Sequence, residues 1–224
     1  MLTERIYTYS ECSLRLAGVA LIEYSNLVIK TSEGVYEPAE DTFLTAEFVE
    51  RAVESFGKDR IDIVDIGTGT GLLGLVAASK DNVNSVMLAD VDKNAVELAE
   101  YNYVANKHAL LAECSFIYSD LFSNIVRHFD LIIFNAPYLR HEKNTEGETS
   151  KQWDGGKEGI EISIRFLEQA KEHLNEGGCI VLVASSLSNL RMLEKKIKGM
   201  DMRIVDRGTA HAFFEDIVVM LIRA

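Results

Sequence analysis

A strand that runs directly into a glycine-rich turn constrains the fold of this chain more than any other feature. Residues 61–66 read Ile-Asp-Ile-Val-Asp-Ile, residues 67–71 read Gly-Thr-Gly-Thr-Gly, and small or apolar residues follow over 72–79. β-Branched residues favour a strand, glycines permit a sharp turn, and the apolar run after them favours a helix. The pattern therefore predicts a strand–turn–helix unit whose turn can approach a ligand.

The alternation of strand and helix continues to the end of the chain. The spacing of apolar residues predicts further helices over 94–105, 161–174 and 187–198, and further strands over 85–89, 114–118, 129–134, 179–184, 202–206 and 217–222. Gly177-Gly178 is expected to turn the chain into the strand at 179. Strands separated by helices form βαβ units, so we expect an α/β fold with a doubly wound, mostly parallel seven-stranded sheet. The last two strands predict an antiparallel hairpin at one edge of that sheet.

The first part of the chain has a different pattern. Residues 1–36 are predicted to be an N-terminal strand extension, with short strands at 19–22 and 27–31. Pro38 is expected to open a helix, because its ring suits the first helical turn, and Gly57 is expected to end it. The domain that holds the sheet is therefore expected to span residues 37–224.

The overall charge narrows the class of partner. The chain has 23 basic and 35 acidic residues, a formal net charge of −12. A field of that sign repels a phosphate backbone, so a protein or peptide is a more favourable partner than a nucleic acid.

The three cysteines lie far apart without CxxC spacing, which argues against a disulfide or metal framework and favours the cytoplasm. The apolar run at 16–22 is too short to span a membrane.

Acidic residues lie at or near the carboxyl ends of three predicted strands, and the first of them comes just before the glycine turn. Because the carboxyl ends of parallel strands meet at one edge of the sheet, Asp65, Asp90 and Asp120 are expected to face one crevice. Gly69, Gly71 and Gly74 also match the dinucleotide fingerprint GxGxxG, so the glycines alone allow NAD as well as S-adenosylmethionine (SAM).

The carboxylate before the first glycine favours SAM over NAD. Asp65 is unsuited to a pyrophosphate but suits the positively charged methionine end of SAM, unless it only braces the loop. Asp90 can accept from both ribose hydroxyls. Asp120 can accept from the adenine amino group with Leu121 against the ring, or it can cap a helical turn. The Thr42 hydroxyl either faces the cofactor or caps its helix.

A four-residue motif after the strand at 129–134 indicates the chemistry. Asn135-Ala136-Pro137-Tyr138 offers two acceptors for a planar NH2 group, the Asn135 side-chain oxygen and the Ala136 carbonyl. Pro137 restricts the backbone, and Tyr138 offers a face on which a planar group can stack. Two fixed acceptors turn the nitrogen lone pair towards a methyl donor, so the motif predicts methyl transfer to nitrogen by alignment, without a dedicated general base.

These motifs together resemble the HemK-related release-factor glutamine methyltransferases of the eukaryotic and archaeal type, which are class I, Rossmann-like enzymes. The resemblance rests on the loop at 65–71, the motif at 135–138, Val-Tyr-Glu-Pro-Ala-Glu-Asp-Thr-Phe-Leu at 35–44 and Trp-Asp-Gly-Gly at 153–156. The family usually has proline where this chain has Ala136; the acceptor carbonyl is retained, but the loop is expected to be less rigid.

The resemblance implies a function and a set of site residues. It implies transfer of a methyl group from SAM, leaving S-adenosylhomocysteine, to the glutamine of the Gly-Gly-Gln tip of a translation termination factor. It implies a heterodimer with a small zinc-binding activator subunit. It implies catalytic and substrate-binding roles for Asn135 and Tyr138, and cofactor contacts from Thr42, Asp65, Gly67, Asp90, Asp120, Leu121 and Asn135. The glycine turn adds Gly69 and Gly71 to the expected cofactor contacts, and the motif at 135–138 adds Ala136 and Pro137 to the expected substrate contacts.

Three other functions remain open at this point. The motif at 135–138 also serves amino-methyltransferases that act on adenine or guanine in RNA or DNA, although the negative charge argues against one. An NAD-dependent oxidoreductase would use the glycines but leave that motif unexplained, and a protein with this fold could also be non-catalytic.

The segment 139–159 lacks apolar periodicity, and we expect it to be a lid that orders on substrate binding.

Overall fold

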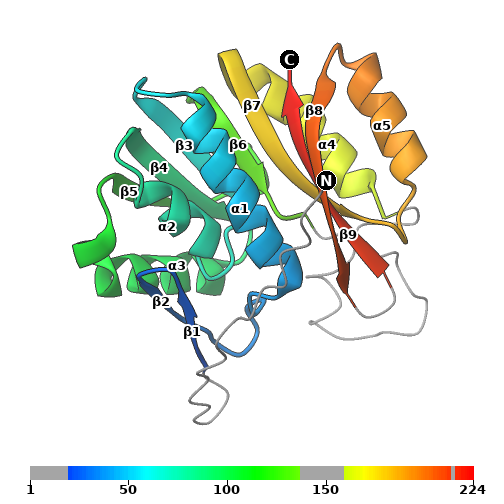
Figure 1. Cartoon of the computed structure of the whole chain (residues 1–224). Helices are drawn as coiled ribbons and strands as arrows, with labels where there is room; N and C mark the ends of the chain where they lie inside the picture. Colours follow the sequence, from blue (N-terminus) through cyan, green and yellow to red (C-terminus); the bar gives the residue numbers. More distant parts are fainter. Residues whose placement is uncertain (1–19, 137–158, 213–214) are drawn as a thin grey trace, which may run out of the picture.

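The computed structural model describes residues 20–136, 159–212 and 215–224. One seven-stranded sheet forms the centre of the molecule, with strand order β5-β4-β3-β6-β7-β9-β8 (Figure 1). Its strands are β3 (Ile61–Ile66), β4 (Val83–Asp90), β5 (Glu113–Tyr118), β6 (Phe129–Phe134), β7 (Leu174–Ser185), β8 (Arg203–Ala212) and β9 (Glu215–Arg223).

The sheet is doubly wound, as predicted. β3 pairs in parallel with both β4 and β6, so the chain winds outward from β3 to β4 and β5 and then crosses back to β6 and β7. β9 is antiparallel to β7 and β8. The antiparallel hairpin at one edge of a mostly parallel sheet is therefore confirmed. The point where the winding reverses, between β3 and β6, is where open α/β sheets bind ligands.

Helices cover both faces of the sheet (Figure 1). One core cluster joins the sheet to α1 (Glu40–Ser55), α2 (Leu72–Ala78) and α3 (Lys93–Ala105). The other joins it to α4 (Glu161–His173) and α5 (Leu190–Gly199). Strand residues alternate between the two clusters, because successive side chains of a strand point to opposite faces. A short 3-10 helix, η1 (Lys107–Ala109), follows α3.

The first two strands form a separate sheet. β1 (Leu21–Tyr24) and β2 (Leu27–Lys30) pair antiparallel. Asn106 Oδ1 accepts from Val28 N at 2.8 Å, and Asn102 Oδ1 accepts from Lys30 N at 2.9 Å, so one amide in α3 and one directly after it hold β2 against the domain. The predicted N-terminal strands are thus present in the described part. The boundary between residues 36 and 37 stays a prediction.

Three predicted boundaries are wrong in detail. Gly177 and Gly178 lie inside β7, not before it, because Leu174 already pairs with Phe129 and the register then shifts across a bulge. A Cβ at Gly178 would lie 2.9 Å from the Asp130 carbonyl, so the bulge requires glycine. α5 begins at Leu190, not 187, because Asn189 Oδ1 accepts from Met192 N and caps it there. α1 begins at Glu40, two residues after Pro38.

Candidate active site

The glycine turn between β3 and α2 has the backbone that its sequence predicts. Gly67, Gly69 and Gly71 all have positive φ angles, 65°, 55° and 86°, a region that side chains with a Cβ rarely adopt. A Cβ at Gly71 would lie 3.0 Å from Ala99 Cβ, so this turn also lets α3 pack closely. At Gly69 a Cβ would meet nothing within 4 Å, so the main chain there is open on one side.

Asp65 lies under this turn and is 1% exposed. Its Oδ2 accepts from Thr68 Oγ1 at 2.6 Å and from Gly74 N at 3.0 Å. Its Oδ1 is buried and has no hydrogen-bond partner among the described residues. Burial is the main reason that the pKa of Asp65 is raised to about 7; the hydrogen bonds from Thr68 and Gly74 oppose this shift, and the nearby Asp90 carboxylate adds to it. One oxygen therefore braces the loop, while the other remains available for a cationic ligand.

Asp90 ties the end of β4 to the glycine turn. Its Oδ2 accepts from Gly69 N at 3.0 Å, and its Oδ1 accepts from Asp92 N at 2.9 Å. Burial raises the pKa of this carboxyl group as well, with the backbone hydrogen bonds opposing that shift. The structure thus brings Asp65 and Asp90 to one side of the turn, as the sequence predicts.

Asn135 follows β6, at the same sheet edge. Its Nδ2 donates to Asp41 Oδ2 at 2.7 Å and approaches Thr42 Oγ1 at 3.3 Å. Asp41 is itself 3% exposed and accepts from the Tyr36 hydroxyl at 2.7 Å. Because a carboxylate only accepts, Asp41 orients the NH2 end of the Asn135 amide towards α1. Asn135 Oδ1 is buried without a partner among the described residues, so it is a free acceptor.

The Asp41 carboxylate is a site residue that the sequence analysis missed. It lies between Glu40 and Thr42 in the segment 35–44, of which only Thr42 is expected from the sequence at the site, where its hydroxyl either faces the cofactor or caps the helix. Thr42 is buried and donates to Asp41 Oδ1 at 3.3 Å, so it belongs to the same network. The available signal was an acidic residue in the first turn of an otherwise apolar helix face, where it becomes buried.

Asp120 and Leu121 lie at the end of β5. The Asp120 carboxylate pairs with the Arg165 guanidinium of α4, and both side chains are about half exposed. Leu121 has a φ of 49° and is 7% exposed, and the Ser119 hydroxyl donates to its carbonyl at 2.8 Å. Because exposed ion pairs contribute little free energy, Asp120 can exchange Arg165 for a ligand at small cost.

Part of the predicted site lies outside the described residues. This applies to Pro137, Tyr138, Trp153 and all of the expected lid except Gly159. Ala136 is described and is 2% exposed.

In the described ranges no cluster of histidine, cysteine and carboxylate side chains could hold a metal ion. No helix in the same ranges is long and apolar enough to cross a membrane.

The sheet order and the glycine turn at its switch point define a Rossmann-like class I methyltransferase fold. Solved structures share it. Methanocaldococcus jannaschii Trm5 in complex with adenosine has a TM-score of 0.69 at 15% identity and covers 93% of this chain and 56% of its own. The E. cuniculi Mtq2–Trm112 complex, which methylates the termination factor eRF1, has a TM-score of 0.61 at 20% identity, covering 84% and 97%.

Sequence comparison places the chain in a family. A model described as the methyltransferase small domain matches residues 26–208, and the chain belongs to that family. A Methanocaldococcus jannaschii protein, provisionally named a protein N5-glutamine methyltransferase, is 32% identical over 89% of this chain and 97% of its own length. The Lactococcus lactis release factor glutamine methyltransferase is 31% identical over 73% of this chain, which spans 61% of that relative. Human methyltransferase HEMK2 is 28% identical over 73% of this chain and 79% of its own length.

Proposed function

We propose that this methyltransferase moves a methyl group from SAM to the side-chain amide nitrogen of a glutamine in a translation termination factor. One observation carries the proposal: Asn135 has its NH2 end held by Asp41 and its Oδ1 buried and unpaired. A buried oxygen without a hydrogen-bond partner costs folding free energy. We therefore infer that its partner is a hydrogen-bond donor of the substrate. An amide NH2 is such a donor.

The residues around the glycine turn fit SAM. The unpaired Asp65 Oδ1 is a counter-charge for the ammonium group of its methionine end. Gly67, Gly69 and Gly71 allow close approach of the main chain, and Asp90 lies where it can accept from the ribose hydroxyls. The adenine end is assigned to Asp120 and Leu121, and Thr42 completes the set beside Asn135. When bound, SAM supplies an electrophilic methyl group on a positively charged sulfur.

The chain's own residues then align the acceptor. Asn135 Oδ1 accepts one N–H of the glutamine amide, and the Ala136 carbonyl accepts the other, which fixes the plane of the amide. Pro137 and Tyr138 are assigned to hold that plane by restricting the backbone and by stacking. The new N–C bond forms as the methyl C–S bond breaks, and the nitrogen then loses one proton to solvent. Alignment is the chief contribution of the protein, so no general base is required before transfer.

The class of substrate follows from the relatives and from charge. Relatives named as glutamine or release factor methyltransferases match most of this chain. A formal charge of −12 disfavours a nucleic acid in the same site. The Mtq2 structure contains Trm112 as a second subunit, which supports a small activator partner for this chain; that this partner binds zinc is part of the proposal. A cytoplasmic location is part of the proposal, because a translation termination factor as substrate fits it.

A methylation assay tests the proposal. The chain, alone and with its candidate activator, is incubated with isotopically labelled SAM and either a termination factor or total RNA from the same organism. We expect label in the factor, and mass spectrometry should place one added methyl group on the glutamine of Gly-Gly-Gln. A factor with that glutamine replaced by asparagine is the control and should stay unlabelled. Label found in RNA alone would overturn the proposal.

A further inference from the structure

The outer face of α5 carries a stripe of positive charge in a chain that is otherwise acidic. Residues 191–207 hold six basic and three acidic residues, whereas the whole chain has 23 basic and 35 acidic residues. Arg191, Lys195 and Lys198 follow one another at spacings of four and three residues, which places them on one face of a helix. We call these three side chains the α5 stripe.

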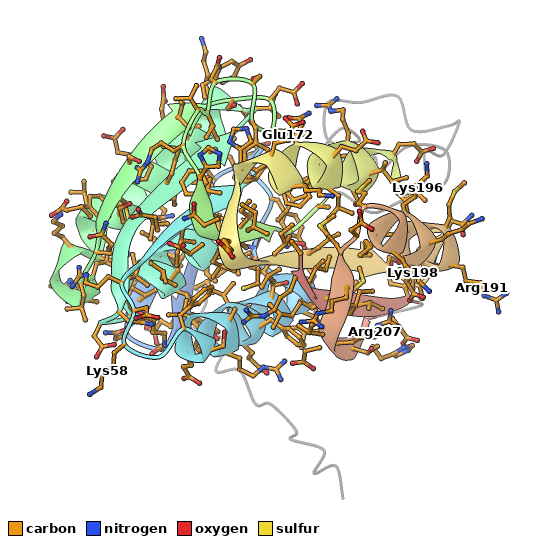
Figure 2. All side chains as sticks on the ribbon, turned by 90° about the horizontal axis from the view of Figure 1, so that it is seen from above. Lys58, Glu172, Arg191, Lys196, Lys198 and Arg207 are labelled. Carbon is orange, nitrogen blue, oxygen red and sulfur yellow. The ribbon has the colours of Figure 1, made fainter. Side chains whose placement is uncertain are left out.

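The α5 stripe faces away from the core. Leu193 and Ile197 are the buried residues of α5, and all three members of the stripe are exposed. The stripe is about 10 Å long, because each helical residue rises 1.5 Å. In Figure 2, Arg191, Lys196 and Lys198 project around α5, whereas Lys58 lies at the opposite end of the molecule. The α5 end of the protein therefore carries a local group of positive charges.

The fold itself makes little use of these charges. In this region, the ion pairs that the described residues form join Arg207 to Glu194 and Arg51 to Asp206, and none includes a member of the α5 stripe. Like charges three and four residues apart on a helix repel, so the stripe opposes helix stability. Only Lys198, in the last turn, gains from the helix dipole. The charges are available to a partner of opposite sign.

The stripe begins at the sheet edge that holds the candidate site. β7 runs parallel to β6, so its carboxyl end lies at the same edge as Asn135, and α5 starts five residues after β7 ends. Ser186, Ser188, Arg191 and Glu194 are among the residues that line a hollow of about 630 Å³ at this end of α5. A protein that inserts a loop into the site can therefore lie along α5 at the same time.

We propose that the α5 stripe binds an acidic surface of the protein that carries the methyl-accepting glutamine. This inference rests on the proposed function. Carboxylates attracted to the stripe would be repelled by the rest of this acidic chain, so the charges favour one orientation of the substrate. RNA fits less well, because α5 has no aromatic side chain on which a base could stack. The stripe would supply affinity and orientation, not chemistry.

The test compares the parent chain with a triple variant, Arg191→Gln with Lys195→Gln and Lys198→Gln. Two substrates are used with each: the intact termination factor and a short peptide around Gly-Gly-Gln. For the intact factor we expect KM to rise about tenfold with kcat little changed, and for the peptide we expect no change. Added salt should raise KM for the factor with the parent and much less with the variant. All three positions are exposed and their neutralisation relieves like-charge repulsion along the helix, so the variant should melt at or slightly above the Tm of the parent.

A charge-matched pair provides the control. Lys195→Glu should raise KM for the factor, whereas Lys58→Glu, with the same change of charge at the far end, should not. Equal KM values for parent and triple variant would overturn the role of the stripe and leave glutamine methylation intact. Failure of the parent to methylate factor and peptide would instead overturn the proposed function. RNA binding lost in the triple variant, with an unchanged KM for the factor, would overturn the choice of partner.

Discussion

At the residue scale, the chemistry depends on which way one amide points. Asn135 has two chemically different ends, and Asp41 accepts from only one of them, at 2.7 Å. The Tyr36 hydroxyl holds Asp41 from the other side. Because both anchors are buried or partly buried, reorienting the amide would leave polar groups unpaired, which is costly. The free oxygen is thus a product of three residues, of which the asparagine is the one that meets substrate.

Replacing Asn135 with alanine removes the proposed acceptor. We expect Asn135→Ala to lower kcat by at least about a hundredfold, comparable with the loss of one fixed hydrogen-bond partner of a transition state. SAM affinity should weaken severalfold at most, because the residue mainly orients the acceptor. Single-turnover rates and calorimetric SAM binding separate the two effects. A variant that keeps a near-normal rate would refute the role given to Asn135.

Asp41→Asn tests the orientation of that amide. An asparagine at position 41 can donate as well as accept, so the Asn135 amide would no longer have a single preferred orientation. We expect kcat to fall about tenfold, since one misplaced acceptor loses alignment without removing it. Asp59→Asn, at an exposed position before β3, is the matched control and should keep the parent rate. Equal rates for the two variants would argue against a positioning role for Asp41.

The raised pKa of Asp65, about 7, predicts two opposite pH dependences. Without ligand, the folded chain holds a proton that the unfolded chain releases above its ordinary pKa of 3.8, so folding stability falls as pH rises from about 4 to 7. Binding of a cationic group needs the ionised form, so SAM affinity should rise over the same range. At pH 6 we expect affinity about tenfold below its plateau.

Measurements of SAM affinity and of urea unfolding between pH 5 and 8 check both trends. Asp65→Asn keeps the size of the side chain but cannot ionise. It should flatten the pH dependence of binding and weaken binding at pH 8. Asp90 also has a raised pKa, so the variant shows which carboxyl group is responsible. A parent affinity that is constant with pH would contradict the assignment of Asp65 to the cationic end of the cofactor.

At the element scale, α2 approaches the sheet closely enough to exclude even a methyl group. A Cβ at Gly74 would lie 2.9 Å from two carbons of Leu88 and 3.2 Å from Asp65 Oδ2. This contact keeps the N-terminal end of α2 against β3 and β4, and so holds the glycine turn in place. Gly74 therefore has a packing role, and its match to a dinucleotide fingerprint reflects helix–sheet contact.

Gly74→Ala and Gly199→Ala form a matched pair of helix glycines. Alanine favours a helix by up to about 1 kcal/mol over glycine. At Gly199, in α5, a Cβ would meet nothing within 4 Å, so stability should rise by a few tenths to about 1 kcal/mol. At Gly74 overpacking should outweigh that gain and lower stability by about 1–3 kcal/mol. Urea denaturation measures both, and a stabilised Gly74→Ala would contradict the close packing of α2.

At the scale of the whole molecule, ligand binding should stabilise the fold, because the proposed cofactor residues come from different strands. Asp65 lies in β3, Asp90 ends β4, and Asp120 and Asn135 follow β5 and β6. Such a site exists only when the sheet is assembled. A ligand that binds it therefore binds the folded state alone and shifts the unfolding equilibrium.

Thermal unfolding with different cofactors tests this coupling. SAM or S-adenosylhomocysteine at about a hundred times its Kd should stabilise the chain by about 2.7 kcal/mol. For a domain of this size, that corresponds to a rise in Tm of about 5–10 °C. NADH should have no effect, and this result would distinguish a SAM site from an NAD site at the glycine turn. Stabilisation by NADH and none by SAM would contradict the methyltransferase assignment at the level of the cofactor.

Local patterns in the sequence are enough to predict the order of the elements, the doubly wound sheet and the positions of the glycine turn and of the motif after β6. These depend on local patterns: strand and helix periodicity, and residues that only a turn or a strand end accommodates. Gly67 and Asp90 could be selected this way because each follows directly from its place at the end of a strand.

Which polar groups are paired becomes clear from the folded arrangement alone. Asp41 and Asn135 are 94 residues apart, and no local pattern predicts that the Asp41 carboxylate accepts a hydrogen bond from the Asn135 NH2 group. The same holds for Asp65, whose two oxygens differ only because Thr68 and Gly74 reach one of them. Hydrogen bonding and burial depend on three-dimensional proximity, whereas periodicity is a property of neighbours along the chain. Whether an oxygen is left unpaired to accept from a ligand therefore depends on the tertiary contacts around it.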